Sequence, residues 1–288
     1  MMKRHLTILT ALLLALTALT ASAQRQKPVK ARVMTFNIRL ENKGDGKNNW
    51  EMRFLQVGEF LRKSKADIIG MQEVKQLQLD DISRALPSYA HVGMARDDGK
   101  QSGEYCPIYY NKEKFELINS GTFWLSETPE TPSTSWGSAC RRIATWAILR
   151  DKETFKNIVA VNTHLDHVSD EARQNGAMLI KERISRMTSE LPVVLTGDFN
   201  VDQSDPVYTK LATRIFPMKD AWTSAPSPKG PAYTFHDFGK IAPADAHKID
   251  FIFVTPKIQV KKSTIVDSAL GNGRYLSDHN PHTADIVF

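Results

Sequence analysis

The chain has 288 residues, of which 41% are hydrophobic, 24% charged and 9% aromatic. This composition is typical of a globular protein and excludes a disordered, collagen-like or coiled-coil chain. The formal net charge of +6, from 38 Lys and Arg against 32 Asp and Glu, permits an anionic substrate but does not indicate a nucleic-acid-binding surface.

The first 23 residues have the pattern of a secretory signal peptide. Lys3 and Arg4 precede an apolar run over 6–19, and the small residues 21–23 provide a cleavage site. A membrane anchor is the alternative, but the run contains several Thr and is shorter than the roughly 20 apolar residues of a membrane span. We therefore expect a periplasmic or secreted protein without stable membrane insertion, and a mature chain that begins at residue 24.

The remaining chain alternates strand-like and helix-like segments. In chain order the sequence predicts a strand over 33–38, a helix over 50–65, a strand over 67–72, a helix that ends at 86, strands over 106–111, 115–124, 143–150 and 158–163, a helix over 169–191, and strands over 193–196, 249–254 and 284–287. Four of these strands follow one another directly, which favours antiparallel pairing over a doubly wound parallel sheet. We therefore expect one α/β domain over 24–288 with two sheets.

Two long loops are predicted over 126–138 and 222–247, and loops of this length in a compact domain are often functional. The rings of the second loop either contact a substrate or anchor the loop; they belong to Tyr233, Phe235, His236 and Phe238.

The chain has two cysteines, Cys106 and Cys140. An exported protein could pair them, and two separate thiols are the alternative. Each lies at the edge of a strand-like segment, and we favour separate thiols.

Polar residues interrupt or follow the apolar strands at six places. They are Asn37; Glu73; His164 with Asp166; Asp198 with Asn200; Asp250; and Asp278 with His279. Burying a carboxylate costs several kcal/mol unless it is paired or binds a metal. One such residue is typical of a capped loop, whereas six places at the ends of core strands indicate a shared pocket.

These places lie in six short motifs. They are Thr35-Phe36-Asn37, Gln72-Glu73-Val74, Asn162-Thr163-His164-Leu165-Asp166, Gly197-Asp198-Phe199-Asn200, Ile249-Asp250-Phe251 and Ser277-Asp278-His279. In this order they resemble the endonuclease/exonuclease/phosphatase superfamily, which includes DNase I-like nucleases, neutral sphingomyelinases and inositol-polyphosphate phosphatases. The resemblance implies a four-layered α/β sandwich, in which two packed, mostly antiparallel β-sheets are flanked by helices.

The resemblance also implies metal-assisted attack of water on a phosphoester. A hard cation such as Mg²⁺, or Mn²⁺ in its place, neutralises the anionic ester and prefers oxygen ligands. The expected ligands are Glu73, Asn37 and Asp278. The alternative for Glu73 is a charge at the N-terminus of the following helix.

Catalytic roles are implied for six side chains. His279 would act as general base and Asp250 would orient it, because an Asp within an apolar strand needs a partner. The alternative is a histidine satisfied in the turn before Pro281. The other four match family positions for the attacking water, the phosphoryl oxygens and the leaving group: Asp198, Asn200, His164 and, as the carboxylate that orients His164, Glu104. For Asp198 and Asn200 the alternative is a β-turn closed by their own side chains.

The sequence therefore predicts an exported, Mg²⁺-dependent phosphoesterase that acts as a monomer. Its substrate could be a nucleic acid, a lipid headgroup, an inositol phosphate or a sugar phosphate. A non-catalytic protein that recognises an anionic ligand on the same fold is the alternative. A glycosidase fits poorly, because paired carboxylates alone give no role to the histidine motifs.

Overall fold

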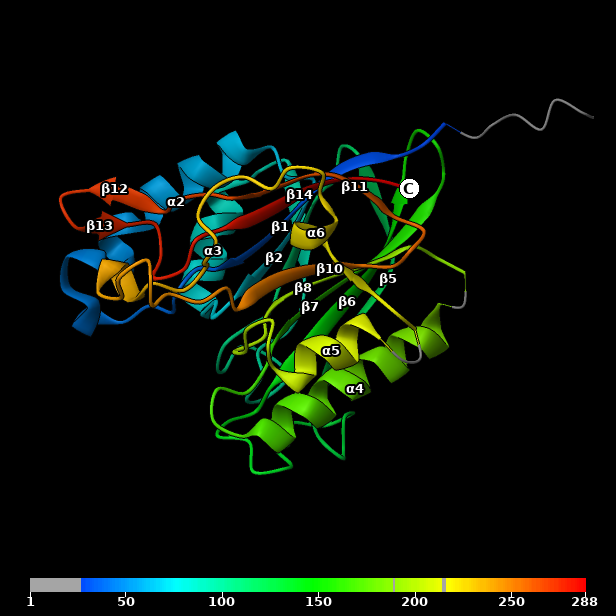
Figure 1. Ribbon diagram of the computed structural model, residues 1–288, viewed down its shortest axis with the longest axis horizontal. Helices are drawn as coiled ribbons and strands as arrows, with labels where there is room; N and C mark the ends of the chain where they lie inside the picture. The colour runs from blue at the N-terminus through cyan, green and yellow to red at the C-terminus, as the bar shows by residue number, and fades with distance from the viewer. Residues whose placement is uncertain (1–26, 189, 214–215) are drawn as a thin grey trace, which may run out of the picture.

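The computed structural model describes residues 27–188, 190–213 and 216–288. The predicted signal peptide lies outside these residues. The described chain forms two stacked β-sheets with helices on both outer sides, which confirms the predicted four-layered α/β architecture (Figure 1). No helix within the described ranges has the length and apolar character needed to cross a membrane.

The first sheet has the strand order β11-β14-β1-β2-β4-β3. Its strands are β1 (Lys30–Asn37), β2 (Ile68–Gln72), β3 (Tyr89–Val92), β4 (Ile108–Asn111), β11 (Gln259–Ile265) and β14 (His282–Val287). Only β1 and β2 pair in parallel, and the other neighbours are antiparallel.

The second sheet has the order β5-β6-β7-β8-β10-β9. Its strands are β5 (Phe115–Trp124), β6 (Ile143–Asp151), β7 (Asn157–His164), β8 (Val193–Asp198), β9 (Lys219–Asp220) and β10 (Asp250–Val254). Here β7 and β8 form the one parallel pair. Each sheet thus has a central parallel pair, and the carboxyl ends of these strands lie at the same end of the sandwich.

Apolar side chains fill the space between the sheets, including Val33 and Ile68 from the first and Leu149 and Ile252 from the second. Helices α2 (Trp50–Ser64) and α3 (Gln76–Ala85) cover the outer face of the first sheet. Helices α4 (Asp170–Met187) and α5 (Pro206–Ala212) cover the second. The remaining short elements are 3-10 turns over Lys43–Asn48 and Asp237–Gly239, α6 (Ala221–Ser224), β12 (Ala269–Gly271) and β13 (Arg274–Tyr275).

Polar side chains also join the two sheets, directly below the strand ends. Gln72 Nε2 donates to Asn162 Oδ1 at 2.7 Å, and Thr196 Oγ1 donates to the same oxygen at 3.1 Å. The sheets approach so closely here that a Cβ on Gly70 would lie 2.1 Å from Thr196 Oγ1. Two directional hydrogen bonds hold this polar bridge, while Gln72 Oε1 is buried without a hydrogen-bond partner.

The predicted helix starts are explained by capping. Asn49 accepts a hydrogen bond from the Met52 N–H at the start of α2, and Ser169 accepts one from the Ala172 N–H at the start of α4. Cys106 lies before β4 rather than inside it, and both Cys106 and Cys140 are free, as favoured from the sequence.

His282 makes folding stability depend on pH. It is fully buried at the start of β14, and its Nε2 lies 2.7 Å from Ser263 Oγ. Burial, with a smaller contribution from the Lys248 cation, lowers the pKa of His282 well below its ordinary value. The unfolded chain then binds a proton below pH ~6.5 that the folded chain does not, so stability is lost as pH falls through that value.

We expect the burial of His282 to lower the free energy of unfolding by up to about 1.4 kcal/mol for each pH unit below pH ~6.5. Urea unfolding of the wild type and of His282→Asn between pH 7.5 and 5 measures this contribution. The variant should show a flatter pH dependence than the wild type. Parallel curves for the two proteins would contradict the assignment.

Candidate active site

The polar residues predicted at the strand ends meet at one end of the sandwich. Asp198 ends β8, and the strand register places it beside His164 at the end of β7 and opposite Asp250 at the start of β10. Asn37 ends β1 in the other sheet, and its Nδ2 lies 2.9 Å from Asp198 Oδ2. Both sheets therefore contribute to one site.

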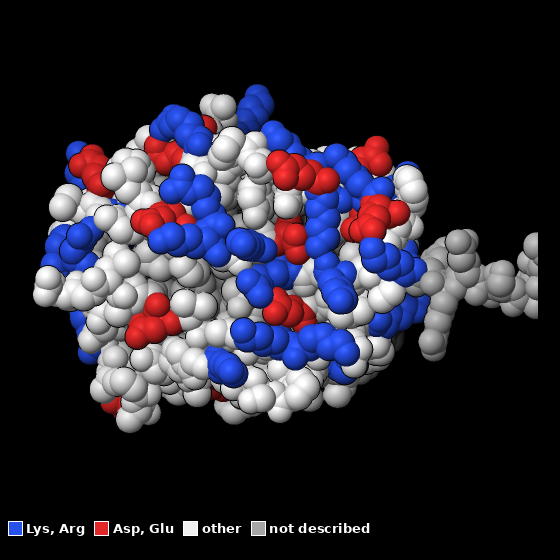
Figure 2. All heavy atoms as spheres, turned by 90° about the horizontal axis from the view of Figure 1, so that it is seen from above, with Lys and Arg blue, Asp and Glu red and all other residues white. Residues whose placement is uncertain are grey.

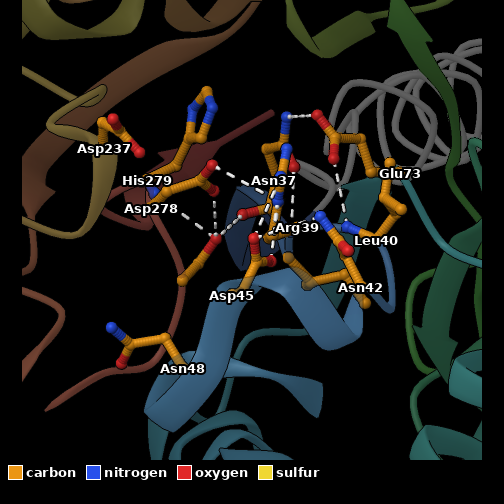
Figure 3. Close-up of polar contacts among 12 residues, drawn as sticks. Asn37, Arg39, Leu40, Asn42, Asp45, Asn48, Glu73, Asp237, Asp278 and His279 are labelled. Carbon is orange, nitrogen blue, oxygen red and sulfur yellow. Dashed lines mark hydrogen bonds and ion pairs between the residues drawn. The ribbon is translucent and has the colours of Figure 1, made fainter.

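Glu73 follows β2 with a left-handed backbone, at a φ of 62°. This turn directs its carboxylate toward β1. Oε1 accepts a hydrogen bond from Asn37 Nδ2 at 2.9 Å, and Oε2 accepts one from the Leu40 N–H at 3.0 Å (Figure 3). Because α3 begins only at Gln76 and has no acidic residue in its first turn, Glu73 is not a helix N-terminal charge.

Asp278 and His279 lie in the loop before β14. Ser277 holds this loop against β1, since its hydroxyl donates to the carbonyl oxygen of Asn37 at 2.7 Å. The Phe235 ring packs on the other side, with its centroid 5.0 Å from that of the His279 ring. Phe235 is thus one loop aromatic that lies in the site rather than only anchoring the loop.

Arg39 is a site residue that the sequence analysis missed. Its Nε lies 3.0 Å from Asp45 Oδ2 and 3.8 Å from Asp278 Oδ2 (Figure 3). Asp45 is the main reason that the pKa of Arg39 is raised above its ordinary value. The signal that could have found it is a basic residue two positions after Asn37, at the same strand end.

His279 and Asp250 form a buried pair. Asp250 Oδ2 lies 2.8 Å from His279 Nδ1, and the other ring nitrogen, Nε2, lies 3.8 Å from Asp198 Oδ2. Burial alone would lower the pKa of His279, but Asp250, followed by Asp198 and Asp278, outweighs it and raises that pKa to about 10. The contact supplies Asp250 with the partner expected from its place in an apolar strand.

Asp198 lies at the centre of the site and is 1% exposed. Burial, and then the neighbouring charge of Asp250, raises its pKa to about 7. Its Oδ1 also accepts the Asn200 N–H at 3.0 Å. The turn proposed as the alternative for this motif is therefore present, and it orients the two side chains within the site.

Asn200 adopts a left-handed backbone, at a φ of 52°, and its Nδ2 lies 3.0 Å from His164 Nε2. Burial, with Arg142 and Arg96 as the largest nearby charges, lowers the pKa of His164 well below its ordinary value. His164 is therefore neutral near pH 7, which lets Nε2 accept the amide hydrogen bond.

Glu104 does not make the contact expected of it. Its carboxylate accepts a hydrogen bond from Arg96 Nη1 at 2.7 Å, and within the described ranges no hydrogen bond joins it to His164. The backbone explains this arrangement, because the Arg96 N–H donates to the Glu104 carbonyl at 3.0 Å and places the two side chains together. The expected orienting role of Glu104 toward His164 has no support from this geometry.

Asp166 and His167, which follow His164 and Leu165 in the chain, have other partners. Asp166 Oδ2 accepts the Val168 and Ser169 N–H groups before α4. His167 is exposed, and its Nδ1 lies 2.8 Å from Nη2 of the buried Arg142.

A cavity of about 510 Å³ contains the site. Seven of the nine predicted site residues line it: Glu73, Glu104, His164, Asp198, Asn200, Asp278 and His279. Asn37 and Asp250 lie behind them and bond directly to lining residues. Arg39, Arg96 and Arg142 add cationic groups to the same cavity.

The donor set fits a hard divalent cation. Ligand atoms of Asp198, Asp250 and His279 lie within 4.8 Å of one another, and Asp250 Oδ1 is buried without a hydrogen-bond partner. Glu73 and Asp278 add two more carboxylates to the same cavity. Oxygen-rich sites of this kind suit Mg²⁺ or Mn²⁺, and a cation there would offset the cost of burying several acidic groups together.

Solved structures share this fold. An endonuclease/exonuclease/phosphatase protein from Bacteroides vulgatus is 46% identical, with a TM-score of 0.87, over 90% of this chain and 98% of that one. A mannosyl-6-phosphatase from Bacteroides thetaiotaomicron is 32% identical, with a TM-score of 0.82, over 90% of this chain and 100% of that one.

Curated proteins with related sequences lead to the same family. Nocturnin from Xenopus laevis is 22% identical over 306 aligned positions, which cover 94% of this chain and 76% of Nocturnin. The matches cover between 60% and 76% of the first curated relatives' own lengths. The pattern of the endonuclease/exonuclease/phosphatase family matches residues 34–279. The chain therefore belongs to the endonuclease/exonuclease/phosphatase family.

Proposed function

We propose that this protein is an exported, Mg²⁺-dependent phosphoesterase that hydrolyses a phosphate ester by direct attack of water. The observation that carries this proposal is the buried His279–Asp250 pair, which lies beside Asp198 in a cavity that also holds Glu73 and Asp278. Export, with cleavage after residue 23, is part of the proposal and rests on the basic and apolar pattern of the first residues.

The side chains divide the chemistry among them. Asp250 holds the His279 ring through Nδ1, so that Nε2 faces Asp198 across 3.8 Å and the two groups would orient a water between them. The surrounding carboxylates raise the pKa of His279 to about 10, so a bound cation would have to offset their charge before the neutral ring takes a proton from that water. Asn200 Nδ2 donates to the Leu165 carbonyl at 3.0 Å and lies 3.0 Å from His164 Nε2. A bound phosphoryl group would replace the contact between these two side chains, and Asn200 Nδ2 and the Nε2–H tautomer of His164 would then donate to its oxygens. Glu73 and Asp278 would hold Mg²⁺, which when bound neutralises charge on the phosphoryl group. Asn37 is the expected third ligand, and its Oδ1, which accepts the Arg39 N–H at 3.0 Å, would have to share its lone pairs with the cation.

Among phosphoesters we favour a sugar phosphate monoester. The mannosyl-6-phosphatase similar to this chain supports this class, as does the size of the cavity. On the face drawn in Figure 2, Lys and Arg are interspersed with Asp and Glu rather than gathered in one stripe. This face therefore lacks the continuous basic stripe that would follow the backbone of a duplex.

A substrate panel in Mg²⁺ tests the proposal. The purified protein should hydrolyse p-nitrophenyl phosphate and mannose 6-phosphate faster than bis-p-nitrophenyl phosphate, plasmid DNA, RNA, sphingomyelin or inositol phosphates. Faster cleavage of a diester would retain the phosphoesterase and reject the monoester class. No turnover of any substrate, with binding of phosphate retained, would favour the non-catalytic alternative.

A further inference from the structure

Arg53 is a buried cation. Within the described ranges, all of its hydrogen bonds go to backbone groups. It lies on α2, and its side chain is 1% exposed. Its guanidinium donates to four carbonyl oxygens, at 2.8 Å to Asn48, 2.5 Å to Ile38, 2.8 Å to Leu276 and 2.8 Å to Arg39. A single planar group therefore joins three separate segments.

Two of these segments carry two of the three expected metal ligands. Ile38 and Arg39 directly follow Asn37, and Leu276 lies two residues before Asp278. Arg53 Nη1 bonds to Ile38 and Leu276 together, so that one nitrogen joins the end of β1 to the loop before β14. The N–H donors of a guanidinium have a fixed planar geometry, which constrains distance and angle together.

The surroundings support this role. The Trp50 ring packs against the guanidinium, with its centroid 5.1 Å from Arg53 Cζ. Burial lowers the pKa of Arg53 to about 10, so the group remains charged near neutral pH and contributes positive charge beside Asp278. Arg53 does not line the cavity that holds His279.

We propose that Arg53 is a positioning residue for the metal centre. It sets the separation between the strand end that carries Asn37 and the loop that carries Asp278, and it contacts neither substrate nor cation. This inference rests on the proposed metal-dependent function, and it adds a requirement that the ligands alone do not supply.

Mn²⁺ binding to the purified protein, measured by calorimetry in the absence of substrate, tests this role. Arg53→Lys keeps a positive charge but loses the planar set of donors. We expect its Kd for Mn²⁺ to rise by about 10–100-fold, as is typical when an outer partner of a metal ligand is changed. At saturating Mn²⁺ the kcat of this variant should lie close to that of the wild type. At limiting Mn²⁺ its activity should fall well below that of the wild type.

Arg173→Lys is the matched control. Arg173 is also a buried arginine; it donates to the carbonyl of Asp166 at 3.0 Å and pairs with Asp170 on α4, on the outer side of the other sheet. We expect this variant to bind Mn²⁺ with wild-type affinity, whatever its loss of thermal stability.

The outcomes separate the two proposals. Wild-type Mn²⁺ affinity in Arg53→Lys would overturn the positioning role while leaving the metal site intact. Equal loss of affinity in Arg53→Lys and Arg173→Lys would also overturn it, because the effect would then be general. If Glu73→Gln binds Mn²⁺ with the same affinity as the wild type, the metal site itself is overturned.

Discussion

Replacing His279 with Ala should lower kcat by about 10²–10⁴-fold, the range that a positioned general base contributes. The reason is that Nε2 of this ring faces Asp198 in the cavity while Asp250 holds Nδ1 at 2.8 Å, so the proposed mechanism assigns proton removal to Nε2. Steady-state rates on p-nitrophenyl phosphate in saturating Mg²⁺ measure the change. A near-wild-type rate would reject His279 as the base.

Two further variants separate chemistry from folding. His279→Ala leaves Asp250 buried without its partner, which destabilises the fold. Adding Asp250→Asn removes that charge, so the double variant should regain stability without regaining activity. His282→Asn, which alters another buried histidine outside the cavity, should keep most of the wild-type kcat at neutral pH.

Removal of divalent metal should abolish activity, and Mg²⁺ or Mn²⁺ should restore it. Without the cation, the phosphoryl group approaches Glu73, Asp198 and Asp278, whose repulsion of an anion opposes the attraction of the arginines in the same cavity. Assays in EDTA, followed by titration with each metal, give the activation constant. Unchanged turnover in EDTA would reject metal dependence.

Glu73→Gln tests where that cation binds. It preserves the shape of the side chain but removes the charge next to Asn37, so we expect a higher activation constant for Mg²⁺. Glu41→Gln, in the segment that follows β1, removes an equal charge from a residue that does not line the cavity. If both variants shift the constant equally, the effect is one of net charge and Glu73 is not a specific ligand.

The sequence predicted the parts of the site that interrupt strong apolar strands. Asp198 and Asp250 were visible because carboxylates in such strands need partners, and the register places them opposite one another. Most strands could be predicted because they consist of β-branched and aromatic residues, which the fold buries.

Other features carried weak signals. The edge strands β3 and β11 were missed, since β3 has no fully buried residue and β11 contains Lys261 and Lys262 on its exposed side. Helix α5 was missed because its Asp205 cap and first-turn Pro206 lie in a short segment that also resembles a turn. The partner of Glu104 depended on a backbone pairing with Arg96 that no local pattern reveals.

The polar bridge formed by Gln72, Asn162 and Thr196 has a consequence for how this scaffold can change. Apolar packing tolerates small slippage of one layer over another, whereas hydrogen bonds of fixed direction resist it. The Gln72–Asn162 bond and the Asn37–Asp198 contact both cross between the sheets at the same end, so rotation of one sheet over the other would strain the two together. A new substrate specificity would then arise from changes in the long loop over 222–247, which reaches the cavity through Phe235, while the orientation of the two sheets stays the same.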